Sequence, residues 1–245
     1  MTPRTTRPVN ADFYVVDDYL SDDDRAIVRR VRGFVSERVL PVINDYWEKA
    51  DFPYEILPAF GELGVAGTAI HGYGCPGMTR LQTGLVAMEL SRGDGSVNTF
   101  NAVHSGLAMG SISLLGSEEQ KQRWLPNMAT LSKLGAFALT EPDHGSDSVA
   151  LETSARRDGD HYVLNGAERW IGLGHVADLV IIWARDTDDA KVKAFVLEKG
   201  PEGYPEGYRA EAIKGKIAKR AIQQAHIEIT DVRIPAENLL AESTS

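Results

Sequence analysis

The spacing of the apolar residues changes once along the chain, near residue 134, and this change limits the possible folds more than any other feature. Before it, apolar side chains recur every three to four residues, which is typical of amphipathic helices. After it they alternate with polar ones, as in half-buried strands. The sequence therefore predicts an α+β protein, with a helical domain at 1–134 followed by an all-β domain, sandwich-like or barrel-like, at 135–245.

Capping and turn residues mark the ends of elements within each half. Ser21 precedes three aspartates and predicts a capping box, and Ser117 predicts a second one. The segment 97–116 is rich in small and apolar residues on all sides, which is typical of a central helix. In the second half, Asp158-Gly159-Asp160 separates two alternating runs and indicates a β-hairpin.

The composition argues against several classes of protein. The net charge is −9, so we expect no nucleic-acid partner, and the basic run at 213–220 is interpreted as a solvated strand and turn. Cys75 is the only cysteine, so we expect no internal disulfide and a reducing compartment, the cytoplasm. No apolar run reaches the roughly 18 residues of a membrane span, and the first ten residues lack the apolar core of a signal peptide.

The loop at 139–148 carries the strongest indication of a binding site. Pro142 and Gly145 shape its backbone so that N–H groups can point to one side, while Thr140 and Ser146 add hydroxyl donors. Such a loop suits a planar, acceptor-rich ligand at a domain seam, although a capped turn without a ligand explains the same composition. Trp170 follows a second turn and could present its ring to that ligand, or be a core aromatic.

A metal site is not predicted. Asp143, His144 and Asp147 are ligand types, but a metal needs convergent ligands and the remaining histidines form no matching pair.

Four motifs in the right order resemble the acyl-CoA dehydrogenase family. "LTEPDHGSD" (139–147) resembles its Leu-Thr-Glu-Pro-x-x-Gly-Ser-Asp signature, and "YVLNGAERWI" (162–171) resembles its Leu-Asn-Gly-x-Lys-x-Trp-Ile-Thr stretch. "LLGSEEQKQRWLP" (114–126) and "DVRIPAENLL" (231–240) resemble the flanking segments. Within the family, "ADLVIIWAR" and "KAFVLEKG" are most similar to glutaryl-CoA dehydrogenase.

The resemblance implies α,β-dehydrogenation of an acyl-CoA thioester, with hydride transfer to FAD. It places the flavin against the loop at 137–146 and the Trp170 segment, where donors on the pyrimidine side favour reduction. Ser146 would lie near the pantetheine, and Asn98 and Thr99 would lie near the acyl chain. The residues implied for the cofactor are Phe137, Leu139, Thr140, Gly145, Ser146, Trp170, Ile171 and Gly172.

The chain also departs from the family pattern. The family's third domain, a helical bundle, carries the glutamate base and part of the FAD site and has no counterpart here, so no catalytic residue is assigned. The resemblance further implies a homo-oligomer or a complementing chain, and an electron-transfer acceptor. Gly172 replaces the family's threonine, and Ser91 and Asn98 replace a Glu and an Arg of glutaryl-CoA dehydrogenases, which disfavours glutaryl-CoA and favours a neutral acyl chain.

Two other functions stay open at this point. The chain could be a catalytically silent remnant or interaction subunit of an acyl-CoA dehydrogenase complex. It could also belong to a fold relative that uses reduced flavin and oxygen for monooxygenation.

Overall fold

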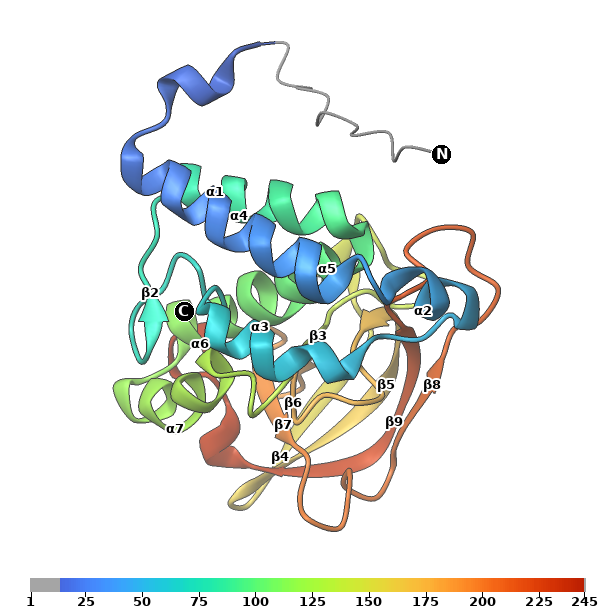
Figure 1. Cartoon of the computed structure of the whole chain (residues 1–245). Helices are drawn as coiled ribbons and strands as arrows, with labels where there is room; N and C mark the ends of the chain where they lie inside the picture. Colours follow the sequence, from blue (N-terminus) through green and yellow to red (C-terminus); the bar gives the residue numbers. More distant parts are fainter. Residues whose placement is uncertain (1–13, 245) are drawn as a thin grey trace, which may run out of the picture.

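The computed structural model describes residues 14–244, so the expectation about a signal peptide lies outside the described residues. Figure 1 shows a layer of helices on one side and a curled sheet on the other. The prediction of a helical domain followed by an all-β domain is confirmed. The C-terminal end lies beside α6 of the helical layer, so the chain returns to the helices after leaving the sheet (Figure 1).

Helices α1 and α7 begin at the two capping residues that the sequence predicts. Ser21 accepts the backbone N–H of Asp24, and Ser117 does the same for Gln120, each within a capping box. The helical elements are η1 (Val16–Tyr19), α1 (Asp22–Phe34), η2 (Val35–Val39), α2 (Ile43–Lys49), η3 (Tyr54–Ile56), α3 (Leu57–Leu63), α4 (Arg80–Gly93), α5 (Gly95–Asn101), η4 (Ala102–Met109), α6 (Gly110–Leu115), α7 (Glu118–Ala129), η5 (Ser148–Ala150), η6 (Ala236–Asn238) and η7 (Ala241–Thr244).

The segment expected to form the central helix is helical throughout, but it consists of α5, the π-helical η4 and α6 in succession. His104 of η4 is fully buried and joins this helix to the first strand of the large sheet. Its Nδ1 accepts the Gly135 N–H at 3.0 Å, and its Nε2 lies 2.9 Å from the Met128 carbonyl oxygen. Burial lowers the pKa of His104 to about 4, so the ring is neutral and its Nε2–H donates to Met128.

The strands form one small hairpin and one seven-stranded sheet in the order β3-β6-β4-β5-β9-β8, with β7 paired to β6. The hairpin predicted at Asp158-Gly159-Asp160 joins β4 to β5 in antiparallel register, whereas β3 runs parallel to β6. The strands are β1 (His71–Gly72), β2 (Cys75–Pro76), β3 (Gly135–Ala138), β4 (Ser154–Asp158), β5 (His161–Gly172), β6 (Leu179–Asp186), β7 (Val192–Glu198), β8 (Tyr208–Ala212) and β9 (Gln224–Pro235).

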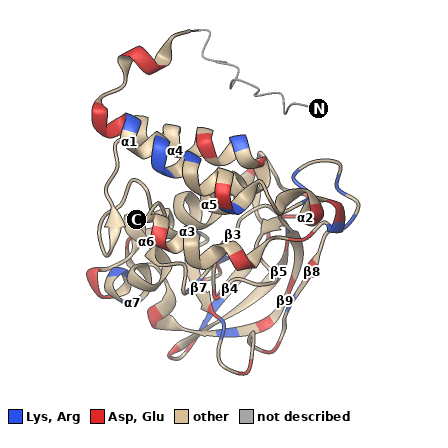
Figure 2. Cartoon of the chain, in the orientation of Figure 1, with Lys and Arg blue, Asp and Glu red and all other residues tan. Residues whose placement is uncertain are grey.

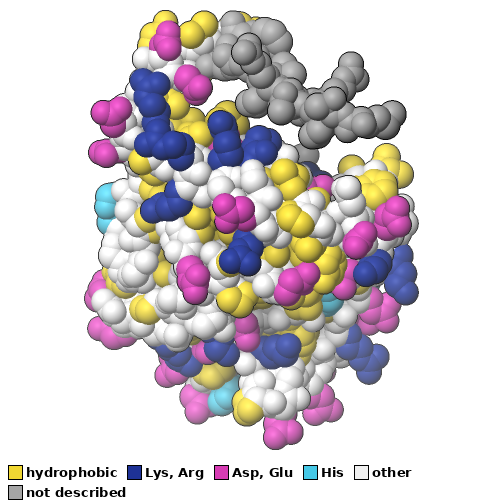
Figure 3. Space-filling model, viewed as in Figure 1, with side chains coloured by type: hydrophobic (Ala, Val, Ile, Leu, Met, Phe, Trp, Pro, Cys, Tyr) yellow, Lys and Arg dark blue, Asp and Glu magenta, His cyan; other side chains and the backbone are white. Residues whose placement is uncertain are grey.

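Acidic and basic residues are interspersed over the elements rather than separated (Figure 2). On the face seen in Figure 3, blue and magenta side chains alternate over the helical layer. The basic run at 213–220, interpreted above as a solvated strand and turn, instead forms a loop between β8 and β9 with no strand, and part of it is bound to the protein itself. Arg220 donates to the carbonyl oxygens of Trp47 and Glu48 at 3.1 Å each, which ties the loop after β8 to the end of α2. Arg220 therefore serves the contact between the two domains.

Candidate cofactor site

Two segments far apart in the sequence meet at the end of β3. The Arg169 N–H on β5 donates to the Thr140 carbonyl oxygen at 2.6 Å. This bond lies outside the regular ladder, because β5 pairs with β4 and β9 rather than with β3. The loop at 139–147 and the Trp170 segment are thus side by side.

A β-bulge aims Trp170 outward. The register between β5 and β9 shifts between Glu168 and Ile171, and Trp170 has a φ of 66°, a left-handed conformation that is rare for an aromatic residue. Its side chain is 52% exposed, and the Arg169 guanidinium lies 5.4 Å from the centre of its ring. Backbone strain of this kind concentrates at binding sites, so the bulge is a candidate site on geometry alone.

The loop offers donors on its open side and is anchored on its buried side. Thr140 is half-buried, and no hydrogen bond of its hydroxyl lies within the described residues. Gly145 and Ser146 are exposed, and a Cβ at Gly145 would meet nothing within 4 Å. The Glu141 carboxylate holds the base of the loop by accepting the backbone N–H of Glu152 at 2.8 Å and that of Thr153 at 2.6 Å.

The segment after the bulge packs against the central helix. Ile171 and Gly172 are buried, and a Cβ at Gly172 would lie only 3.0 Å from a methyl group of Val103 on η4. Position 172 is therefore small because Val103 occupies the neighbouring space. A threonine here would displace Val103.

The residues expected near the acyl chain lie on the helical side of this seam. Asn98 and Thr99 are half-buried on α5, about one turn before Val103. The Thr99 hydroxyl donates to the Gly95 carbonyl oxygen at 2.8 Å, so its proton is already engaged. Ser91 is exposed at the end of α4.

Phe137 lies in β3, and Leu139 is the first residue after the strand, where the loop begins. Both are half-buried, and the Phe137 ring lies 5.9 Å from that of Trp183 on β6. The structure therefore groups Phe137, Leu139, Thr140 and Trp170 around the end of β3, with Gly145 and Ser146 further out on the loop.

Sequence reasoning missed one functional candidate, Glu168. Its side chain is 0% exposed, and burial first and the neighbouring Glu141 second raise its pKa to about 9. The signal was present in the sequence, because Glu168 stands where the family stretch quoted above has a lysine.

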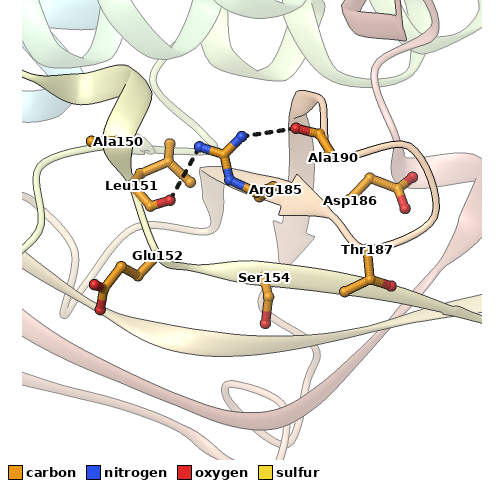
Figure 4. A pocket seen from close by; sticks show the side chains of 8 residues that line it. All are labelled: Ala150, Leu151, Glu152, Ser154, Arg185, Asp186, Thr187 and Ala190. Atoms are coloured by element: carbon orange, nitrogen blue, oxygen red, sulfur yellow. Dashed lines mark hydrogen bonds between the residues drawn. The ribbon is translucent and has the colours of Figure 1, made fainter.

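A pocket of about 560 Å³ lies beside β4 and β6 (Figure 4). Arg185 points across it, but its guanidinium donates to the carbonyl oxygens of Ala190 at 2.8 Å and Val149 at 2.6 Å. These bonds hold the segment before β4 in place and leave little of the guanidinium for an anion. None of the residues predicted for the cofactor lines this pocket.

Between residues 14 and 244 there is no group of three or more ligand side chains that could hold a metal ion. No helix in this range is long and apolar enough to cross a membrane.

Comparison with known proteins identifies the family. Sequence profiles of the acyl-CoA dehydrogenase N-terminal domain and of its middle domain match residues 21–132 and 136–232. The chain is an acyl-CoA dehydrogenase family member.

Individual relatives agree over most of this chain. The short-chain specific acyl-CoA dehydrogenase of Clostridium acetobutylicum is 33% identical over 232 residues, which are 93% of this chain and 60% of that protein. The glutaryl-CoA dehydrogenase of Mycobacterium smegmatis, solved in complex with FADH2, superposes with a TM-score of 0.88 at 38% identity, over 94% of this chain and 58% of that one.

A chain in the solved structure of the electron transferring flavoprotein of Acidaminococcus fermentans superposes with a TM-score of 0.84 at 30% identity, over 91% of this chain and 59% of that one. The present chain thus spans about 60% of the length of each of these three relatives.

Proposed function

We propose that the protein to which this chain belongs catalyses FAD-dependent α,β-dehydrogenation of an acyl-CoA thioester. The chain would supply one wall of the flavin site, made of residues 137–146 and 170–172. The observation that carries this proposal is the Arg169–Thr140 hydrogen bond, because it joins the donor-bearing loop to a half-exposed, backbone-strained tryptophan. When bound, FAD would accept the hydride from the β-carbon of the substrate.

The residues present fit such a cofactor. An exposed indole on a rigid strand offers a flat apolar face, and the hydroxyl of Thr140 can donate to an acceptor-rich ring edge. Donors fixed in advance stabilise negative charge that develops on that edge, which favours reduction. Ser146, exposed further along the loop, would contact the pantetheine and phosphate side of the thioester.

The general base is assigned to no residue of this chain. We propose that it lies in a further segment or in a complementing chain, and that the active protein is a homo-oligomer or a complex with such a chain. An electron-transfer acceptor would reoxidise the flavin. The role would belong to fatty acid metabolism, and the single cysteine supports a cytoplasmic location.

A neutral acyl chain is the proposed substrate. Asn98, half-buried on α5, offers no positive charge to a distal carboxylate, and burying an unpaired carboxylate costs on the order of 3 kcal/mol. A neutral acyl-CoA should therefore bind more tightly than glutaryl-CoA.

The experiment is a flavin titration of the purified chain, alone and with a candidate partner, followed in the visible spectrum. Trp170→Ala should weaken FAD binding, whereas Trp47→Ala should not. Trp47 is a matched control because it is 41% exposed and also lies beneath an arginine, with Arg220 4.9 Å from the centre of its ring.

Ser146→Ala should weaken acyl-CoA binding more than FAD binding. If the purified chain binds no FAD even in the presence of a candidate partner, the protein is a catalytically silent remnant. Oxygen consumption that depends on externally supplied reduced flavin would instead indicate a monooxygenase.

A further inference from the structure

Glu168 lies in surroundings that disfavour the ionised form of its carboxyl group. Its side chain is fully buried, and its Oε2 has no hydrogen-bond partner among the residues described. The other oxygen, Oε1, accepts one long hydrogen bond, from the Thr153 hydroxyl at 3.4 Å. A carboxylate in such surroundings would be an unpaired buried charge, whereas a neutral carboxylic acid leaves only one donor unsatisfied.

The ionisable groups around Glu168 add negative rather than positive charge. Glu141, in the loop after β3, is 6% exposed and acts on Glu168 through its charge. Tyr208 of β8 is a further ionisable neighbour, and Glu168 contributes to raising its pKa. The Tyr208 hydroxyl donates to the Gly174 carbonyl oxygen at 2.6 Å and is therefore no counter-ion.

Glu168 also belongs to a closed series of contacts between the two segments proposed to line the flavin, the Thr140 loop and the Trp170 bulge. Glu141 follows Thr140 directly in the sequence, and its carboxylate accepts a hydrogen bond from the Thr153 backbone N–H at 2.6 Å. Thr153 in turn reaches Glu168 through its hydroxyl. The next residue, Arg169, donates its N–H back to Thr140.

Gly166 allows strand β5 to pack closely against Thr153, one of the residues in this series of contacts. A Cβ at position 166 would overlap the Thr153 side chain, so only glycine lets β5 approach Thr153 this closely.

We propose that Glu168 is a positioning residue, which as a neutral carboxylic acid holds the Thr140 loop against the Trp170 bulge and on ionisation lets the two separate. The proton leaves to solvent, and the two carboxylates that result repel each other at the base of the loop. The backbone at Trp170 is then no longer held in the conformation that directs its side chain outward. The significance for catalysis rests on the proposed function, because it assumes that this wall holds a flavin.

The protonation state is tested by infrared difference spectra of the chain against Glu168→Gln near neutral pH. Wild type should show the C=O stretching band of a protonated carboxylic acid, and the Gln variant should lack it. Absence of that band in wild type would overturn the proposal. Far-UV circular dichroism of both proteins establishes that the variant is folded.

The positioning is tested by the emission of Trp170, taken as the difference between wild type and Trp170→Phe, over a pH range centred on about 9. Wild type should show a transition, Glu168→Gln should show none, and Glu141→Gln should move the transition to lower pH because it removes the repelling charge. A flat profile in wild type, or the same transition in Glu168→Gln, would refute the positioning role.

A parallel FAD titration separates the two proposals. Wild-type affinity should weaken about fivefold from about pH 9 to about pH 10, while that of Glu168→Gln stays constant. If no variant binds FAD but the band and the emission transition are present, the proposed function fails and the positioning role stands. If FAD binds and the band is absent, the positioning role fails alone.

Discussion

Replacing Glu168 by Gln should make the protein more stable at neutral pH, by an amount that grows with pH. The variant keeps the size and shape of the side chain and removes its proton equilibrium. In the unfolded chain the pKa of a glutamate is about 4.3, whereas burial and Glu141 raise the pKa of Glu168 to about 9 in the folded protein.

The magnitude follows from proton linkage. Below about pH 4 the carboxyl is protonated in both states, so its titration contributes nothing. Above that, only the folded state retains the proton, and the free energy of unfolding of wild type decreases by about 1.4 kcal/mol per pH unit until the folded pKa is reached. From about pH 4.3 to about pH 7 this amounts to roughly 3–4 kcal/mol, a large fraction of the 5–15 kcal/mol that stabilises a typical domain.

The assay is urea unfolding at about pH 5.5 and about pH 7.5, followed by circular dichroism. The stability advantage of Glu168→Gln over wild type should increase by roughly 2–3 kcal/mol between the two conditions. Glu228→Gln is the matched control, since Glu228 is exposed on β9 opposite Ala167 and should show no such increase. An advantage that is equal at both pH values would refute the reasoning, because it would mean that Glu168 is ionised in the folded protein.

Three further substitutions test the surrounding structure, each by urea unfolding. Glu168→Lys should also abolish the pH dependence and stabilise the chain by about 1–3 kcal/mol near pH 7, since it gives Glu141 a counter-ion; a lower stability than wild type would contradict this. Glu89→Gln should destabilise by about 2–3 kcal/mol, because the Glu89 carboxylate is buried between Arg32 at 2.6 Å and Arg92 at 2.9 Å. Burial by itself raises the pKa of Glu89, but the hydrogen bonds and charges of these arginines together lower it, so the difference should begin to diminish below about pH 4.3, the pKa of an unfolded glutamate, and be lost as the pH falls through the lower folded pKa; a difference unchanged by acid would count against the ion pairs. Gly166→Ala should cost about 1–3 kcal/mol by overpacking against Thr153, whereas Gly145→Ala, in open space, should change stability by less than about 0.5 kcal/mol; equal effects would contradict the close approach.

Much of the fold was predictable because it depends on neighbours in the sequence. The capping boxes at Ser21 and Ser117 and the turn at Asp158-Gly159-Asp160 involve residues three or fewer positions apart. Apolar periodicity likewise reports which side of a helix or strand is buried. The change of period near residue 134 was therefore enough to predict helices followed by strands.

The location of the candidate site was also available from the sequence, through the motifs around Thr140 and Trp170. Their resemblance to a known family implied that they line the same ligand. What the motifs could not reveal was the bulge before Ile171 and the left-handed backbone of Trp170, because both arise from the pairing of β5 with β9.

The sequence by itself determined the order of the elements, the two structural halves and the segments that carry the candidate cofactor residues. Only the tertiary structure decided that Glu168 is buried beside Glu141 and that His104 joins η4 to β3. The physical reason is that burial and charge proximity depend on strands and loops distant in the chain. A glutamate in an alternating run looks the same in sequence whether it faces water or a second carboxylate.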